Sequence, residues 1–233
     1  MKAIIKSVPI LCALFSPVIF ACEKPASVCF QDNEGLPLIS DGQPLPIIIS
    51  PSADSAVKRV AKAFSQDIQR VGGTPAGISQ SQSISQPAVI IGVLGEDILI
   101  DELVQKGKLD VSQIKGQWEA YQIAVVEEPS PGVEHALVVV GADRRGAIFG
   151  TFDISEQMGV SPWYWFADVP TELKSNVFIT AGSTQDKPKV RYRGIFINDE
   201  DPALKGWAQK KFGGVNAGMY EHVFDLILRL KGN

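Results

Sequence analysis

Short apolar runs alternate with amphipathic stretches along most of the chain. The runs predict buried strands at 46–50, 88–92, 121–125, 136–141 and 176–180. Between them, apolar residues three and four positions apart predict helices at 52–71, 96–106 and 143–158. Because strands that alternate with helices pack as layers, the pattern predicts an α/β fold.

Particular residues indicate where two of these helices start and how one of them packs. Ser52 is expected to cap the first helix. Gly146 and Gly150 lie four positions apart within the third helix, and small residues at that spacing would let it approach the sheet closely. The run Asp143-Arg144-Arg145-Gly146 fits either a capped helix start with two surface arginines, which is favoured, or an anion site at a helix N-terminus.

Composition divides the chain into successive segments. An apolar leader at 1–21 and an irregular lead-in at 22–45 precede an α/β domain at 46–180. A polar linker at 181–188 then leads into 189–233, which carries one predicted strand and its helices. The predicted fold class is α/β, with an N-terminal α/β sandwich-like domain followed by the first βα unit of a truncated (β/α)8 barrel.

The last segment holds the candidate catalytic residues. A strand is predicted at 189–201, ending in a cluster of acids, and helices are predicted at 203–212 and 217–231. The second helix is expected to bury an apolar face made of Met219, Val223, Phe224, Ile227 and Leu230.

Strand parity separates the acids at the end of the predicted strand. Alternate residues face opposite sides, so Asn198 and Glu200 are expected to point into the mouth of the barrel. Asp199 would point away unless the strand has already turned into a loop. The plainer alternative, which the pattern alone favours, is that these residues form a turn and cap the next helix.

The acids and a nearby aromatic run fit carbohydrate chemistry. Glycosidases use two carboxyl groups, about 5–5.5 Å apart when retaining and about 6.5–9.5 Å apart when inverting. Side chains of strand neighbours diverge, so at most one member of the pair is expected from Asp199 and Glu200. Trp163 and Tyr164 begin an aromatic run whose flat rings could stack on sugars, the alternative being packing at a domain junction.

Charge and metal-ligating residues argue against other functions. Lys and Arg total 22 against 26 Asp and Glu, a net charge of -4, so no basic excess is present to bind nucleic acid. The chain has 3 Cys and 2 His, which poorly supports a zinc site.

The first 21 residues have the pattern of a secretory signal, with Lys2 and Lys6 before an apolar stretch too short to span a bilayer. The residues Ile19-Phe20-Ala21-Cys22 resemble a bacterial lipoprotein box, in which Cys22 would carry a lipid anchor. Without a lipid, Cys22 could pair with Cys29 in an oxidising compartment. The protein is therefore expected to be exported, to the periplasm, the extracellular space or, as a lipoprotein, the outer membrane.

Three long segments resemble the xylan α-1,2-glucuronidase family, glycoside hydrolase family 115. They are GADRRGAIFGTFDISEQMGVSPWYWFADVP at 141–170, YRGIFINDEDPALKGWAQKKFGG at 192–214 and YEHVFDLILRLKGN at 220–233. The resemblance implies removal of 4-O-methylglucuronic acid from glucuronoxylan or its oligosaccharides by an inverting route, without a metal or organic cofactor. The family's Ile-Asn-Asp-Glu motif falls on Ile197, Asn198, Asp199 and Glu200, and this implies that these carboxylates help to line the glucuronate pocket.

The resemblance also implies a size difference, because members of that family are several times longer. This chain resembles their first domain and first βα unit, so it is expected to be inactive alone. Two alternatives remain: a non-catalytic exported domain that binds polysaccharide weakly, and a truncated, unstable product.

Overall fold

The computed structural model of the protein describes residues 22, 24–31 and 35–233. The predicted signal segment, 1–21, lies outside these residues. Within the described part of the chain, no helix is both long and apolar enough to cross a membrane.

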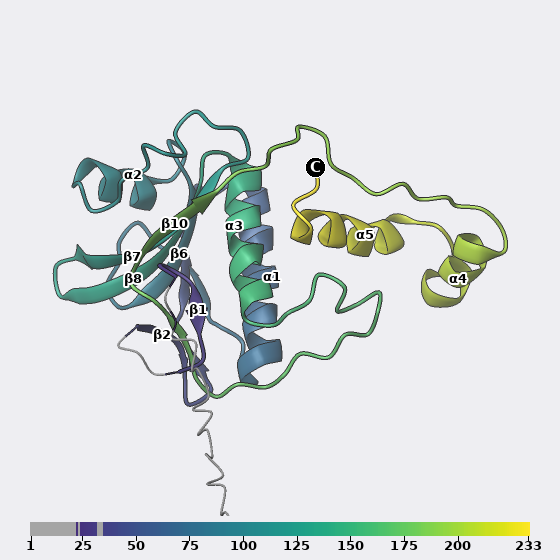
Figure 1. Ribbon diagram of the computed structural model, residues 1–233, viewed down its shortest axis with the longest axis horizontal. Helices are drawn as coiled ribbons and strands as arrows, with labels where there is room; N and C mark the ends of the chain where they lie inside the picture. Colours follow the sequence, from purple (N-terminus) through teal and green to yellow (C-terminus); the bar gives the residue numbers. More distant parts are fainter. Residues whose placement is uncertain (1–21, 23, 32–34) are drawn as a thin grey trace, which may run out of the picture.

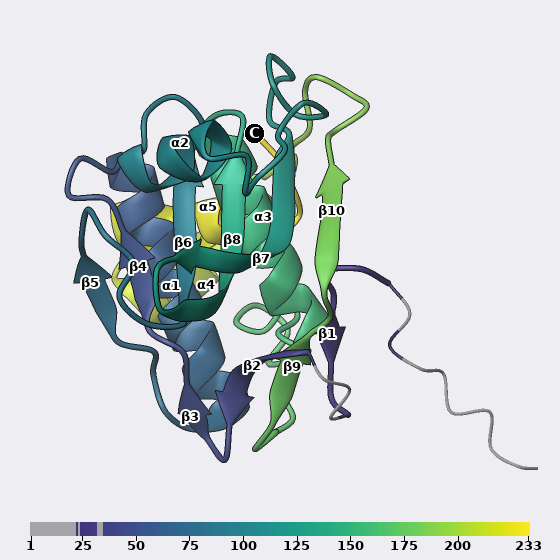
Figure 2. The same cartoon turned by 90° about the vertical axis from the view of Figure 1, so that its left-hand side faces the viewer.

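A six-stranded mixed sheet forms the centre of the protein (Figure 2). Its strands follow the order β10 (Gly182–Asp186), β7 (Tyr121–Ser130), β8 (Val133–Gly141), β6 (Ala88–Val93), β4 (Ile47–Ile49) and β5 (Ile78–Gln80). The last four are parallel, whereas β7 and β10 run antiparallel to their neighbours. The α/β class predicted from the sequence is confirmed.

Helices cover both faces of this sheet. Helices α1 (Ser55–Gly72) and α3 (Arg144–Gln157) lie on one face, and α2 (Ile98–Gln105) lies on the other (Figure 1). Two apolar clusters of buried residues fill the two interfaces. Because both faces are covered, β6 and most of β8 are apolar without alternation, which is why the sequence showed them as continuous runs.

A second, antiparallel sheet contains three short strands from the predicted lead-in. It consists of β1 (Val28–Cys29), β9 (Val177–Ile179), β2 (Leu36–Ser40) and β3 (Gln43–Pro44), in that order. A disulfide joins Cys22 to Cys29 at the start of this sheet. The lead-in was expected to be irregular, and this is wrong because β9, from a distant part of the sequence, pairs with both β1 and β2.

Residues 181–188 do not form the predicted linker, because β10 occupies most of them. This strand pairs antiparallel with β7, from Gly182 opposite Val125 to Asp186 opposite Tyr121. It lies at the edge of the sheet and is mostly exposed, so its residues are polar and carry no apolar alternation. An exposed edge strand of this kind leaves no hydrophobic pattern in the sequence.

Two sequence predictions about helix starts had different outcomes. Helix α1 is capped by Asp54, whose Oδ1 accepts from the Ala56 backbone N–H at 2.7 Å, and not by Ser52. The hydroxyl of Ser52 instead lies 2.9 Å from that of Ser50. Asp143 caps α3 as predicted, with Oδ1 accepting from Gly146 N–H at 2.9 Å. The capped helix start is therefore the arrangement observed.

The close approach of α3 to the sheet is confirmed. A Cβ added to Gly146 would lie 2.0 Å from the carbonyl oxygen of Ala120, and one added to Gly150 would lie 2.8 Å from the Tyr121 ring. Neither position has room for a side chain.

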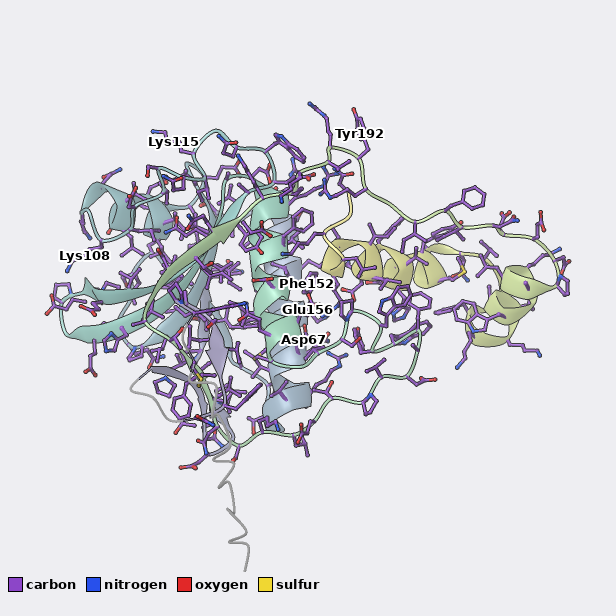
Figure 3. The ribbon with its side chains drawn as sticks, in the orientation of Figure 1. Asp67, Lys108, Lys115, Phe152, Glu156 and Tyr192 are labelled. Atoms are coloured by element: carbon purple, nitrogen blue, oxygen red, sulfur yellow. A yellow bond between two sulfur atoms is a disulfide. The ribbon has the colours of Figure 1, made fainter. Side chains whose placement is uncertain are left out.

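No strand forms at 189–201, although the sequence predicts one there. Residues 187–202 form no helix or strand and run away from the six-stranded sheet as an extended segment (Figure 1). Among the described residues no neighbouring strand pairs with it, and a β-strand needs such a partner to satisfy its backbone groups. Tyr192 projects from the segment into solvent (Figure 3), and Phe196 is 90% exposed.

The segment ends in two helices, α4 (Ala203–Phe212) and α5 (Ala217–Arg229), as predicted. Helix α5 packs beside α3, outside the layer formed by α1 and α3 (Figure 1). Its buried residues are Met219, Val223, Leu226 and Arg229. The predicted apolar face is therefore partly wrong, because Phe224 is 57% exposed and Leu230 is also exposed.

Candidate functional site

The predicted catalytic residues lie on the exposed part of the extended segment. Asn198, Asp199 and Glu200 are all exposed. No hydrogen bond or ion pair joins their side chains to any other described residue; the only bond here is from Lys205 N–H to the backbone oxygen of Glu200, at 3.4 Å. The catalytic roles of Asp199 and Glu200 and the binding role of Asn198 therefore stay predictions.

The capping alternative for these acids does not hold. Helix α4 begins after Pro202 without any side-chain hydrogen bond to its first turn. The neighbouring acid, Asp201, pairs with Lys205 at 2.9 Å on the surface. The acidic run is thus not explained by the start of α4.

The aromatic run divides between packing and exposure. Trp163 is 43% exposed, whereas Trp165 stacks on the imidazole of His222 with ring centroids 4.0 Å apart. Trp165 also meets Trp207 of α4 edge to face at 6.0 Å. The run therefore joins the first domain to α4 and α5, so the domain-junction alternative describes Trp165. The predicted binding role of Trp163 remains a prediction.

Tyr164 is half-buried, and two guanidinium groups lie close to its ring. The Cζ atoms of Arg70 and Arg229 are 4.3 Å and 4.9 Å from the centre of its ring. Burial, followed by the charge of Asp225, raises the pKa of Tyr164 above its ordinary value. The phenol therefore stays neutral and gives the two cations an aromatic face on which to lie.

A cavity of 440 Å³ opens beside this run. It is lined by residues of α1, of the loop at 161–170 that carries the aromatic run (the aromatic loop) and of α4, namely Arg70, Tyr164, Trp165, Phe166, Asp168, Trp207 and Lys211. Tyr164 is among the site residues predicted from the sequence, whereas Arg70, Trp207 and Lys211 are not. The available signal was the spacing of Trp207 and Lys211, which are four positions apart and so share one face of α4.

A buried ion-pair network holds α5 against α1 beside the cavity. Arg229 is 4% exposed and donates from Nη1 and Nη2 to the two carboxylate oxygens of Asp67, at 2.8 Å and 3.2 Å. Its Nε donates to Asp225 at 2.7 Å. Asp67 and Phe152 lie on the sides of α1 and α3 that face α5 (Figure 3).

The charge state of Arg229 follows from these partners. Burial alone would lower its pKa, but the charges and hydrogen bonds of Asp67 and Asp225 outweigh burial and hold the pKa above its ordinary value. Arg229 therefore remains charged. A buried charge of this kind requires an oppositely charged partner inside the interface.

A second cluster ties the end of the chain to the loop before β7. Glu119 accepts from Arg193 Nη2 at 2.5 Å, from Asn233 Nδ2 at 2.9 Å and from Arg145 Nη1 at 3.3 Å. Burial by itself would raise the pKa of Glu119, but the hydrogen bonds from Asn233 and Arg193 and the charges of Arg193 and Arg145 lower it overall. Glu119 thus contributes stability in its ionised form.

This cluster predicts that stability falls in acid. A carboxyl whose pKa is lower in the folded protein stabilises the fold above its unfolded pKa, about 4.3 for glutamate, and loses that contribution as the pH falls through the folded value. The melting temperature of Glu119→Gln should therefore lie below that of the native protein at pH 7, and the difference should narrow between about pH 5 and pH 3.

The matched control for this prediction is Glu96→Gln, because Glu96 is exposed and its side chain has no partner among the described residues. Its melting temperature should follow that of the native protein at every pH. A constant difference between Glu119→Gln and the native protein over this range would contradict the role of the ionised carboxylate.

Within the described residues no group of three or more His, Cys, Asp or Glu side chains is arranged to hold a metal ion. The groups that line the cavity are two cations, one carboxylate and several aromatic rings.

Comparisons with known proteins identify relatives of both parts of the chain. The family model "Glycosyl hydrolase family 115" matches residues 185–233. A solved structure of a family GH115 4-O-methyl-α-glucuronidase, BtGH115A, described as specific for decorated arabinogalactans, is similar with 34% sequence identity and a TM-score of 0.70. That match covers 85% of this chain and 25% of the solved one.

Other solved structures are less similar. The GH20 β-N-acetylhexosaminidase from Streptomyces coelicolor A3(2) shares 14% identity with a TM-score of 0.42, covering 72% of this chain and 26% of that one. The structure of CpGH84D shares 13% identity with a TM-score of 0.40, covering 90% and 35%. No curated protein matches the sequence.

The family model and the BtGH115A structure together place the chain among the glycoside hydrolases. More particularly, it belongs to glycoside hydrolase family 115, as the three sequence segments indicated. It spans about a quarter of the length of the solved relative.

Proposed function

We propose that this protein takes part in the hydrolysis of glucuronic acid or 4-O-methylglucuronic acid side chains on a plant polysaccharide. The observation that carries the proposal is the family match at 185–233, because it includes Asn198, Asp199 and Glu200. The similar solved structure is named as a glucuronidase, which supports the same reaction.

The polysaccharide we propose is glucuronoxylan, on the basis of the resemblance found in the sequence. Decorated arabinogalactan is the second candidate, because the solved relative is described as specific for it. The relative is named as a 4-O-methyl-α-glucuronidase, so the reacting sugar that we propose is the same for both polysaccharides.

We propose an inverting reaction in which Glu200 or Asp199 supplies one carboxyl group of the acid–base pair. An inverting pair stands about 6.5–9.5 Å apart, so that a water molecule fits between the second carboxylate and the sugar. The exposed position of both acids leaves room for a further element to bring that second carboxylate opposite them.

We propose that residues 1–233 are inactive without such an element. Asp199 and Glu200 are exposed and have no partner among the described side chains, so no other described group orients either acid or excludes water from it. The second candidate function, a non-catalytic exported domain that binds polysaccharide, is favoured by the aromatic cavity, which is formed without any further element.

The experiment measures release of glucuronic acid from glucuronoxylan and from arabinogalactan. The chain alone should release none, whereas the chain combined with the remaining part of a family 115 relative should release it. In the combined enzyme, Glu200→Gln or Asp199→Asn should lower kcat by about 10²–10⁴-fold.

Asp201→Asn is the matched control, because Asp201 is the adjacent exposed acid and, among the described residues, its side chain pairs with Lys205 alone. Its activity should remain close to that of the unchanged enzyme. A folded combined enzyme without activity, or equal losses from Asp201→Asn and the two motif variants, would refute the proposed roles.

We also propose export to an oxidising compartment, which the Cys22–Cys29 disulfide supports. A lipid on Cys22 would exclude this disulfide. The intact mass of the protein purified from its host, with and without reductant, distinguishes a disulfide-bonded chain from a lipidated one.

A further inference from the structure

We propose that the cavity lined by Arg70, the aromatic loop and α4 binds a hexuronate residue, that is, a pyranose sugar carrying a carboxylate. The site is separate from the predicted catalytic acids, because neither Asp199 nor Glu200 lines it. The proposal rests on the proposed function in one respect, which is that the ligand comes from an acidic polysaccharide. The cavity, the charges and the aromatic rings from which we argue all belong to this chain.

The size and walls of the cavity suit a sugar ring. Its volume of 440 Å³ lies within the range of about 300–1,000 Å³ that is usual for small-molecule sites. Trp165, Phe166 and Trp207 contribute flat apolar surface, against which the C–H groups of a pyranose can pack.

These rings are held in place by contacts with His222 and Phe212, which do not line the cavity, and with one another. Trp165 stacks on His222, and the ring of Trp207 lies 5.6 Å from that of Phe212. Phe166 and Trp207 have ring centroids 6.2 Å apart. Because the aromatic walls are already ordered, a bound sugar would cost little side-chain entropy.

The charges of the cavity suit a carboxylate. Lys211 is exposed, and its ammonium has no ion-pair or hydrogen-bond partner among the described residues. Arg70 uses Nη1 to donate to Asp67 at 2.9 Å, and its guanidinium lies 4.3 Å from the Tyr164 ring centre. No bond within the described chain occupies its Nη2 or Nε, so an oriented guanidinium edge remains available for an anion.

Arg70 and Lys211 give the cavity two positive charges and Asp168 gives it one negative charge. The lining therefore carries a net charge of one positive unit. The Asp168 side chain also has no partner among the described residues, and carboxylate oxygens accept hydrogen bonds from sugar hydroxyls. The three groups together distinguish a uronate from a neutral sugar by its carboxylate, and from a simple carboxylic acid by its hydroxyls and ring.

The test uses the 233-residue chain and the indole N–H signals of its tryptophans in an NMR titration. The chain has 4 Trp. Two of them, Trp165 and Trp207, line the cavity, whereas Trp118 and Trp163 do not. Sodium D-glucuronate should shift the signals of Trp165 and Trp207 in a saturable way and leave the other two unchanged. D-glucose and acetate should bind at least fivefold more weakly.

Matched variants test the charge. Lys211→Gln should weaken glucuronate binding about tenfold, as expected for loss of a charged hydrogen bond. Lys210→Gln should leave it unchanged, because Lys210 is the adjacent exposed lysine and does not line the cavity. Both substitutions are on the surface, so both variants should fold.

Three outcomes would overturn the proposal: no saturable shift with glucuronate, shifts of equal size with glucose or acetate, or equal weakening by Lys210→Gln and Lys211→Gln. The titration requires no hydrolysis. Binding without glucuronic acid release in the combined enzyme would refute the proposed function alone, and release without binding at this cavity would refute this site alone.

Discussion

Asp67→Ala is expected to destabilise the protein by about 3–5 kcal/mol, because it leaves the guanidinium of Arg229 buried without its main partner. Arg229 is 4% exposed, and Asp67 accepts from both of its terminal nitrogens. Asp225 would remain bonded to Nε, which is too few contacts for a buried cation. Urea unfolding should show a lower midpoint, and hydrogen exchange should show loss of protection in α5.

The matched control is Glu221→Ala, which removes the other ion pair between α1 and α5. Arg59 and Glu221 approach to 2.8 Å, but their side chains are 59% and 61% exposed. An exposed pair contributes about 0–1 kcal/mol, so this change should have little effect. Equal losses in the two variants would show that burial does not decide the strength of the Asp67–Arg229 pair.

A double variant separates loss of the pair from exposure of an unpaired charge. Asp67→Leu combined with Arg229→Met should recover most of the stability that Asp67→Ala loses, because no buried charge is left. If the double variant is less stable than Asp67→Ala, the pair itself, and not the unpaired cation, stabilises the interface.

The sequence predicted the elements whose pattern arises from local structure. Strand β6 is buried on both faces and therefore reads as a continuous apolar run. Helix α3 carries its own start signal in Asp143, and its two glycines showed the close approach to the sheet correctly. In each case the cause lies within a few residues of the pattern that it produces.

The errors occurred where the decisive pairing partner is distant in the sequence, or where the described residues offer no pairing partner. Strand β10 is polar and exposed, and it is a strand because it pairs with β7. The reverse holds at 189–201, where residues suited to a strand have no neighbouring strand among those described. Pairing, more than intrinsic preference, decides whether such segments form strands.

The candidate site divides in the same way. The acids at 198–200 were found because they form a contiguous motif, and Tyr164 was found within a contiguous aromatic run. Arg70 and Lys211 belong to helices far apart in the sequence, and the docking of α4 on the aromatic loop brings them to one cavity. Docking of this kind depends on aromatic contacts such as Trp165 with Trp207, which no local pattern in the sequence indicates.

Gly146→Ala is expected to destabilise the protein by about 3 kcal/mol or more, at the upper end of the usual cost of overpacking. The new methyl group would lie 2.0 Å from the carbonyl oxygen of Ala120 and 3.1 Å from the Cα of Gly141. Both contacts are to backbone, so no side-chain rotation can relieve them and α3 would have to move away from the sheet. Thermal unfolding followed by circular dichroism would measure the loss.

Gly206→Ala is the matched control, since Gly206 also lies inside a helix but has open space where its Cβ would be. Alanine favours a helix over glycine by about 0.5–1 kcal/mol, so this variant should be slightly more stable than the native protein. Both substitutions make the same chemical change. Opposite signs of their effects on stability would therefore be due to the space available for the new methyl group at each position. A small effect of Gly146→Ala, comparable to that of Gly206→Ala, would mean that α3 does not lie as close to the β7 side of the sheet as the structure places it.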